Sequence, residues 1–314
     1  MDRFVAAPCS RERVNLGESC RWDAVHNRLL WVDVFTGRLF CAHAKSTGLN
    51  TTDVYRVPGH LTAVAPLAHP GGGWMAAANQ GFYHLAEDGT VTLLAEPEAG
   101  KDGRVRMNDG ACDPAGRFWA GSMSYEGAPG AGSLYRHDGL GRYTRVVTDV
   151  TISNGLAWSP DGTAMYYVDS GPGTISAFSY DTAAGVPASR RCLVGLEPAE
   201  GVPDGLCLDA EGCLWVAIWG GGQVRRYTPD GELIATVAVA ATRPSSCALG
   251  GDDGRTLYIT TARDGIGPDD LAGQPDAGRL FCVQVTTPGP PAQPSLHPPP
   301  GPRSAAGPQP GKDQ

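Results

Sequence analysis

A unit that recurs about every 45 residues constrains the fold of this chain more than any other feature. In the clearest copy, Asp204 is followed by an alternating apolar run (Leu206, Leu208), a tight turn at 209–212 and a second apolar run from Leu214. This pattern predicts two short antiparallel strands joined by a turn, with the carboxylate just before the first strand. Six such units follow one another, and each has an aromatic anchor in its second apolar run: Trp31, Trp74, Trp119, Tyr166, Trp215 and Tyr258.

The spacing of these anchors identifies the architecture. Consecutive anchors are 43 to 49 residues apart, which is the length of a four-stranded propeller blade. Glycine is abundant (43 residues), and no helix-period pattern extends over ten residues. The sequence therefore predicts an all-β chain folded as a six-bladed β-propeller.

The two ends of the chain are expected to behave differently. A closed propeller requires the ends to share a blade, because otherwise two sheet edges stay open. The segment 278–285 is the last predicted strand, and we expect a strand around Arg3 to Ala7 to add to that sixth blade. From Pro288 onward Pro, Gly, Ser and Gln dominate, which is typical of segments that cannot bury a core. We predict a propeller over residues 1–287 and a disordered tail over 288–314, dispensable for the chemistry.

Composition argues against several classes of protein. The formal net charge of −8 disfavours binding to nucleic acid or a membrane surface through basic patches. No apolar run approaches the roughly 20 residues that a membrane span needs. The N-terminus is too polar for a signal peptide, and the nine cysteines include no C-x-x-C pair. We therefore expect reduced thiols and a cytoplasmic location, with no nucleic-acid or membrane partner.

Polar residues occupy the head of the first predicted strand in several units. The innermost strands of a propeller line its central channel, so equivalent strand heads meet at one end of it. This arrangement brings Glu18, Asn154 and Asp204 around the axis. Two carboxylates and an amide oxygen suit Ca²⁺, Mg²⁺ or Mn²⁺, and carboxylates also accept Zn²⁺ or Fe²⁺. Asn-Gly and Pro-Asp-Gly alone are most often turns, but their equivalent place in separate units favours a metal site.

A second polar cluster lies beside this predicted site. Arg106 and Asn108 lie two residues apart and are suited to bind the hydroxyl groups of a polar substrate, with a structural ion pair as the alternative for Arg106. Glu126 follows on the loop after the same unit's second predicted strand. The chain contains no G-x-S-x-G elbow, phosphate-binding glycine loop or EF-hand loop.

Five motifs in order resemble the SMP-30/gluconolactonase/luciferin-regenerating-enzyme family, especially its regucalcin-type sugar lactonases. They are Leu-Gly-Glu18-Ser, Arg106-Met-Asn108-Asp-Gly, Ile-Ser-Asn154-Gly-Leu, Gly-Val-Pro-Asp204-Gly and Thr-Ala-Arg263-Asp-Gly. The resemblance covers roughly residues 10 to 285 and implies a six-bladed propeller. It also implies one divalent metal bound by the residues Glu18, Asn154 and Asp204. It further implies substrate contacts from Arg106 and Asn108 and, as in some members, from Glu126.

These observations predict a metal-dependent hydrolase that opens sugar lactones to aldonic acids. The metal polarises the lactone carbonyl, a water attacks it, and Asp204 is the best candidate to take the proton of that water. Arg106 and Asn108 orient the ring hydroxyls. Two alternatives stay open, namely a calcium-binding regulatory propeller without turnover and an esterase or phosphotriesterase on the same site. The ligand set admits Ca²⁺, Zn²⁺, Mg²⁺, Mn²⁺ or Fe²⁺.

Overall fold

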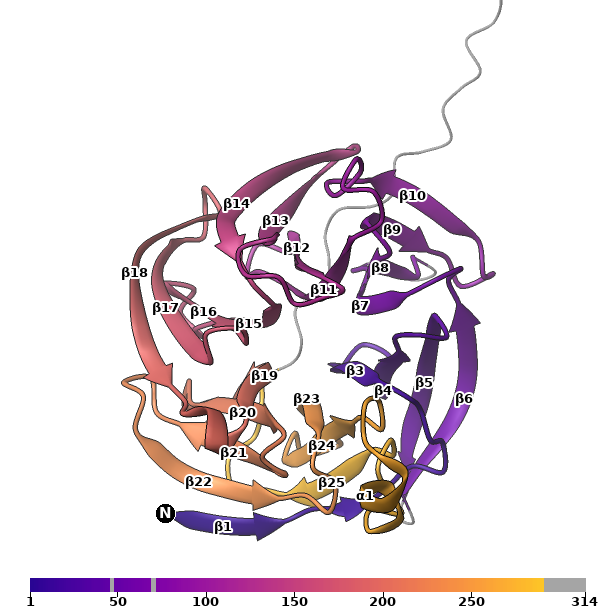
Figure 1. Cartoon of the computed structure of the whole chain (residues 1–314), viewed down its shortest axis with the longest axis vertical. Coiled ribbons are helices and arrows are strands. Elements are labelled where there is room, and N and C mark those ends of the chain that lie inside the picture. Colours follow the sequence, from indigo (N-terminus) through magenta and orange to yellow (C-terminus); the bar gives the residue numbers. More distant parts are fainter. Residues whose placement is uncertain (46–47, 69–71, 291–314) are drawn as a thin grey trace, which may run out of the picture.

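The computed structural model describes residues 1–45, 48–68 and 72–290 and confirms the predicted six-bladed propeller (Figure 1). The strands of each blade run outward from the central channel in chain order, and we number the blades by their innermost strands. The innermost strands of blades 1 to 6 are β3 (Gly17–Asp23), β7 (Leu61–Pro66), β11 (Val105–Cys112), β15 (Ser153–Trp158), β19 (Val202–Leu208) and β23 (Pro244–Gly250).

Each innermost strand pairs antiparallel with a second strand that is almost wholly buried. The second strands are β4 (Arg28–Asp33), β8 (Trp74–Ala78), β12 (Phe118–Ser124), β16 (Ala164–Asp169), β20 (Leu214–Trp219) and β24 (Thr256–Thr261). The third strands are β5 (Arg38–Lys45), β9 (Gly81–Leu85), β13 (Gly132–Gly139), β17 (Thr174–Asp181), β21 (Gln223–Tyr227) and β25 (Phe281–Gln284). The fourth strands of blades 1 to 5 are β6 (Gly48–Arg56), β10 (Val91–Ala95), β14 (Arg142–Val150), β18 (Val186–Gly195) and β22 (Leu233–Ala238).

All six aromatic anchors lie on second strands and are buried between blades, as the repeat predicts. In two blades a buried aspartate ties the anchor to the preceding turn. Asp209 accepts two backbone N–H bonds from that turn, at 3.0 and 3.1 Å, and a third bond from Trp215 Nε1 at 3.0 Å. Asp113 repeats the arrangement with two backbone N–H groups and Trp119 Nε1 at 3.1 Å. One carboxylate therefore fixes both the hairpin turn and the core residue that follows it.

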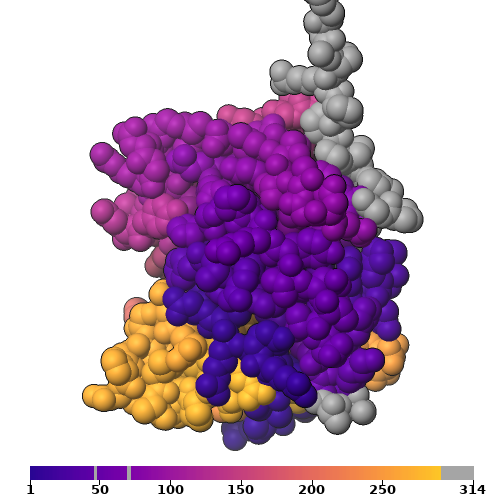
Figure 2. Space-filling view, turned by 90° about the vertical axis from the view of Figure 1, so that its right-hand side faces the viewer, coloured from indigo at the N-terminus to yellow at the C-terminus, as the bar shows by residue number. Residues whose placement is uncertain are grey.

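The N-terminal segment closes the propeller across two blades rather than one. The strand β1 (Asp2–Val5) pairs parallel with β22 of blade 5, and β2 (Ala7–Pro8) pairs antiparallel with β25 of blade 6. The prediction of a single strand at Arg3 to Ala7 in blade 6 is therefore wrong for its first part. Figure 2 shows these indigo residues next to the yellow C-terminal ones. One crossing segment covers the outer edges of both closing blades, which removes two open edges at once.

A break in strand register occurs within every innermost strand. The pairing of the first and second strands shifts between Glu18 and Arg21, Leu61 and Ala63, Met107 and Gly110, Ser153 and Leu156, Pro203 and Leu206, and Pro244 and Ser246. Such bulges turn side chains out of the regular alternation and are common beside functional sites. Asp204 thus lies inside a bulge of β19, whereas the sequence pattern predicted it just before the start of that strand.

Helices are short in the described part of the chain. They are the 3₁₀ turn η1 (Pro198–Glu200) and α1 (Pro268–Ala272). Among the described residues, none of the helices has the length and apolar character needed to cross a membrane. Pro288 still contacts the propeller, since its carbonyl accepts the N–H of Ala210 at 2.8 Å. The rest of the predicted tail, 291–314, lies outside the described residues.

Candidate metal centre

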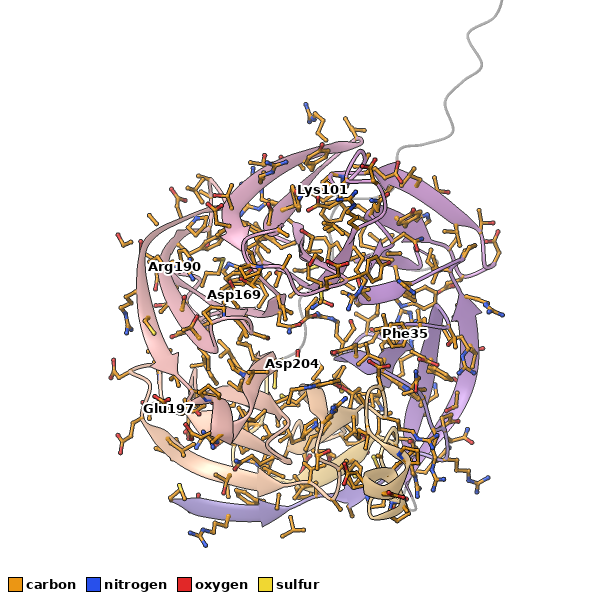
Figure 3. The ribbon with its side chains drawn as sticks, viewed as in Figure 1. Phe35, Lys101, Asp169, Arg190, Glu197 and Asp204 are labelled. Carbon is orange, nitrogen blue, oxygen red and sulfur yellow. The ribbon has the colours of Figure 1, made fainter. Side chains whose placement is uncertain are left out.

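The bulges of three blades bring the predicted metal ligands to one cavity at the head of the channel. Glu18 of β3, Asn154 of β15 and Asp204 of β19 all line this cavity, whose volume is about 330 Å³. Figure 3 shows Asp204 close to the axis of the propeller. Arg106 and Asn108 of β11 line the same cavity, so five of the six predicted site residues lie together.

The glycines after two of the ligands allow neighbouring innermost strands to approach closely. A Cβ on Gly155 would lie 2.6 Å from the carbonyl oxygen of Asp204, and a Cβ on Gly205 would lie 2.7 Å from Cα of Ser246. Both distances are too short for any larger residue. Asn154-Gly and Asp204-Gly are therefore points of close approach between blades and not hairpin turns.

A hydrogen-bond chain fixes the orientation of the Asn154 amide. Asn154 Nδ2 donates to Ser170 Oγ at 2.7 Å, and Ser170 Oγ donates in turn to the carbonyl oxygen of Pro203 at 2.6 Å. Because the Ser170 hydroxyl uses its hydrogen on Pro203, it accepts from Asn154, and the amide nitrogen must face it. Asn154 Oδ1 is thereby turned toward Asn108, whose Nδ2 donates to it at 2.7 Å.

Asp204 carries a buried oxygen without a protein partner. The residue is 4% exposed, and its Oδ1 receives no hydrogen bond from the described residues. Buried carboxylate oxygens normally have a donor or a cation, because leaving one unsatisfied costs about 1–3 kcal/mol or more. Together with a second carboxylate and an oriented amide oxygen, this donor set fits a hard divalent cation.

The local charges favour the protonated forms of both carboxyl groups. Burial and then the nearby Asp204 and Asp109 raise the pKa of Glu18 well above its usual value, against the opposing effect of Arg106. Burial and then Asp109 likewise raise the pKa of Asp204 well above its usual value. The single guanidinium of Arg106 therefore does not balance the carboxylates around it. A divalent cation would supply the missing positive charge.

Asn108 and Arg106 are hydrogen-bonded to one another and to the ligand set. Arg106 Nη1 donates to Asn108 Oδ1 at 2.5 Å and to the carbonyl oxygen of Met107 at 2.9 Å. The Asn108 amide nitrogen donates to Ser153 O and to Asn154 Oδ1, both at 2.7 Å. Both N–H groups of Asn108 are therefore engaged, so this residue holds Asn154 and Arg106 in place more than it offers donors to a substrate.

Glu126 lies outside this cavity. It is exposed on the loop after β12 and borders a neighbouring pocket of about 530 Å³ together with Lys101 and Arg104. The preceding residue, Tyr125, does line the cavity, and its hydroxyl is hydrogen-bonded to His60 Nδ1 at 2.8 Å.

Sequence reasoning did not single out the residues that complete the cavity from the second strands. Phe35, Tyr125 and Ser170 follow the ends of β4, β12 and β16, and Trp219 ends β20. In an antiparallel hairpin the end of the second strand lies beside the start of the first. A search of the residues at and shortly after the end of each predicted second strand would therefore have found them.

Another group of potential ligands serves a structural role. Ligand atoms of Asp209, Glu211 and Cys213, one from each residue, lie within 4.8 Å of one another. However, Arg226 already bridges Asp209 and Glu211, with both contacts at 2.7 Å. Both oxygens of Asp209 also accept the hydrogen bonds that fix the turn and Trp215. A guanidinium thus occupies the position that a cation would need.

The fold and cavity define a six-bladed propeller with a carboxylate-lined pocket at the head of its channel. The family model described as SMP-30/gluconolactonase/LRE-like region matches residues 16–263, and the chain belongs to this family. Regucalcin of Oryctolagus cuniculus is 39% identical over 279 residues, covering 87% of this chain and 91% of the relative.

Two solved structures share the whole architecture. A structure described as a calcium-binding protein, regucalcin, from Agrobacterium tumefaciens has a TM-score of 0.86 at 28% identity and covers 95% of this chain and 99% of that one. A luciferin-regenerating enzyme has a TM-score of 0.84 at 25% identity and covers 93% and 99%. The family resemblance inferred from the five motifs is therefore confirmed.

Proposed function

We propose that this protein is a metal-dependent lactonase that opens sugar lactones to aldonic acids. One observation carries the proposal: Glu18, Asn154 and Asp204 converge in one cavity in which a buried oxygen of Asp204 has no donor among the described residues. The family, whose description includes gluconolactonase, supports the reaction class. The calcium-binding regucalcin with a similar structure supports a divalent ion.

The three ligands Glu18, Asn154 and Asp204 would hold one divalent ion, which when bound acts as a Lewis acid on the lactone carbonyl. Calcium, zinc, magnesium, manganese and iron(II) are all candidates for this oxygen-rich set. Ser170 and Asn108 keep the amide oxygen of Asn154 directed at the site. Such outer hydrogen bonds orient metal ligands and raise affinity.

Asp204 is the proposed general base. It is buried at the cavity wall, in the same cavity as the other predicted ligands, Glu18 and Asn154. A water beside the Asp204 carboxylate would lose a proton to it as the water attacks the carbonyl carbon. The bond between the carbonyl carbon and the ring oxygen then breaks, and the ring oxygen takes that proton from Asp204 and leaves as the hydroxyl of the aldonic acid.

Arg106 and the aromatic wall would orient the substrate. Arg106 is buried beside both carboxylates, and its guanidinium is suited to bind ring hydroxyls. Phe35, Tyr125 and Trp219 offer apolar surface on which the C–H face of a sugar ring packs. Glu126 remains a proposed substrate contact only for a substrate long enough to reach the neighbouring pocket.

A calcium-binding regulator without turnover is the second candidate, and the calcium-binding relative favours it. An esterase or phosphotriesterase on the same site is the third. We further propose a cytoplasmic protein whose partners are small molecules, supported by an odd number of scattered cysteines and a net charge of −8.

The test uses pH-stat titration to measure proton release during the hydrolysis of a panel of sugar γ- and δ-lactones. The protein is stripped with a chelator and resupplied with one metal at a time, and spontaneous ring opening is subtracted. Metal-restored turnover would support the lactonase. No turnover of any lactone, with metal binding verified separately, would reject the lactonase and favour the calcium-binding regulator. Turnover of aryl esters or phosphotriesters alone would favour the esterase or phosphotriesterase.

A further inference from the structure

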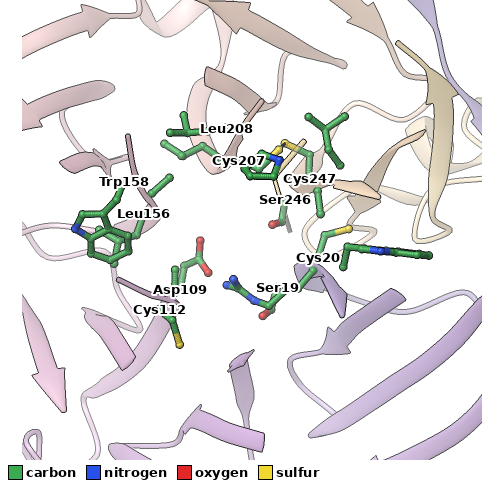
Figure 4. Close-up of a pocket in the computed structure, with 18 of the residues that line it drawn as sticks. Ser19, Cys20, Asp109, Cys112, Leu156, Trp158, Cys207, Leu208, Ser246 and Cys247 are labelled. Carbon is green, nitrogen blue, oxygen red and sulfur yellow. Dashed lines mark hydrogen bonds between the residues drawn. The ribbon is translucent and has the colours of Figure 1, made fainter. Parts of the chain in front are cut away.

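A second pocket lies at the other end of the channel, and none of the proposed metal ligands lines it (Figure 4). Its volume is about 250 Å³. Residues within and after the bulges of the innermost strands form its wall, with Cys20 from β3, Cys207 from β19 and Cys247 from β23 among them. Nothing in the proposed lactonase reaction uses this pocket.

Two thiols from different blades meet in its wall. Sγ of Cys207 in blade 5 lies 3.8 Å from Sγ of Cys247 in blade 6, and both residues are free thiols. Figure 4 shows their sulfur atoms side by side. Cys207 is partly exposed into the pocket, whereas Cys247 is 1% exposed. A small solute that enters the pocket therefore meets Cys207 first.

The hydrogen bonds of this pair suit bond formation between the sulfurs. The thiol of Cys247 donates to the carbonyl oxygen of Trp215 at 3.3 Å. This bond directs the hydrogen of Cys247 away from Cys207 and leaves a sulfur lone pair facing it. The hydrogen bond with Cys207, together with burial, raises the pKa of the Cys247 thiol. Because Cys207 is the partly exposed member of the pair, we assign the first attack to Cys207.

The backbones beside the pair are already in contact. Gly205 of β19 packs against Ser246 of β23 so tightly that a Cβ would lie 2.7 Å from Cα of Ser246. A disulfide needs the sulfurs to close from 3.8 Å to about 2.05 Å. The two strands are in contact one to two residues away from the thiols, so the two blades already lie side by side at this point.

We propose that Cys207 and Cys247 form a dithiol that hydrogen peroxide oxidises to a disulfide linking blades 5 and 6. The sulfur of Cys207 attacks one peroxide oxygen, the O–O bond breaks, and water leaves with the thiol proton, which gives a sulfenic acid on Cys207. The sulfur of Cys247 then attacks the sulfur of Cys207 and displaces hydroxide, which leaves as a second water with the Cys247 proton. Two thiols and one peroxide thus give one disulfide and two waters.

Cysteines at three other places in the fold serve as internal comparisons. Cys20, in the same pocket, donates to the carbonyl oxygen of Tyr258 at 3.6 Å and is directed away from the pair. Cys9 and Cys282 are hydrogen-bonded to each other where the N-terminal segment joins blade 6, a contact that raises the pKa of Cys9. Cys192 is exposed on the outermost strand of blade 4 and provides a matched control for a surface thiol.

The experiment treats the folded full-length wild-type protein with increasing peroxide and then unfolds it in denaturant, so that every remaining thiol, including the buried Cys247, is alkylated. Cross-linked peptides are then mapped by mass spectrometry without reduction. We expect a Cys207–Cys247 cross-link, a loss of two alkylatable thiols, reversal by dithiothreitol and a melting temperature several degrees above that of the reduced protein. Cys192→Ser should give the same cross-link, and Cys207→Ser should give none.

Two results would overturn the proposal. One is that Cys207 and Cys247 are still fully alkylated after other thiols have been oxidised, including the case in which Cys9 and Cys282 form the cross-link instead. The other is oxidation of Cys207 to a sulfinic acid with Cys247 still a thiol. Because the decisive mapping uses the wild-type chain, the proposal can be tested even where a variant fails to fold.

Discussion

Removing the hydroxyl of Ser170 tests how the proposed metal ligands are held. Ser170 is 4% exposed and joins two ligand segments, because its Oγ accepts from Asn154 and donates to Pro203, the residue before Asp204. In Ser170→Ala the Asn154 amide loses its orienting partner and a buried carbonyl loses its donor. Loss of such an outer contact typically weakens metal binding about 10- to 100-fold, which corresponds to about 1.4–2.7 kcal/mol.

The assay is calorimetric titration of chelator-stripped protein with Ca²⁺ and Mn²⁺, accompanied by urea unfolding of the metal-free form. We expect the weakened binding above and a free energy of unfolding lower by about 1–3 kcal/mol. Ser159→Ala is the matched control, because Ser159 lies in the turn at the opposite end of the same β15–β16 hairpin and bonds only locally. Metal affinity in Ser170→Ala within twofold of wild type would refute the reasoning.

Three further predictions follow from the same contacts. Asn108→Ala should weaken metal binding several-fold as well as raise KM, because Asn108 donates a hydrogen bond to Asn154. A raised KM with unchanged metal affinity would show that Asn108 contacts the substrate and does not support the metal ligand. Asp209→Asn should lower the free energy of unfolding by about 1–3 kcal/mol and leave metal affinity unchanged, and loss of the ion in this variant would contradict its structural role. Buried Asp204 has a raised pKa in the metal-free fold, so the folded protein binds this proton more tightly than the unfolded chain does. The proton therefore stabilises the folded state fully below about pH 4, the pKa of an unfolded aspartate, and this stabilisation is lost as pH rises through the pKa of the folded state. The melting temperature of the metal-stripped protein should therefore fall from acidic to neutral pH, and it should fall less in Asp204→Asn. The same decrease in melting temperature in both proteins would contradict this role of Asp204.

The parts of the fold set by local pattern were predictable from the sequence. The aromatic anchors and the turns that precede them recur at blade spacing, so the six blades and the convergence of Glu18, Asn154 and Asp204 on one cavity followed from one repeat. The path of the N-terminus was not predictable, because Asp2–Val5 is equally able to extend either closing blade and tertiary packing selects parallel pairing with β22.

The supporting residues of the site were also out of reach for pattern reasoning. Ser170 and Tyr125 follow second strands, where polar and aromatic residues are ordinary, and only the antiparallel return brings them to the cavity. The bulges that aim Glu18 and Asp204 depend on pairing register, which a repeat of apolar residues does not specify. Glu126 was predicted from the family resemblance and its place on the loop after β12, and that loop places it at the neighbouring pocket.

The most direct test of the metal centre compares metal content and affinity in three proteins: wild type, Asp204→Ala and Asp209→Asn. Each is stripped, reloaded with a single divalent metal, desalted and analysed for bound ion per chain, with affinity from calorimetry. We predict one ion in wild type and Asp209→Asn, and at least roughly 100-fold weaker binding in Asp204→Ala because one of three ligands is lost. Wild-type affinity in Asp204→Ala, or an ion lost only with Asp209, would show that the channel head is not the metal centre.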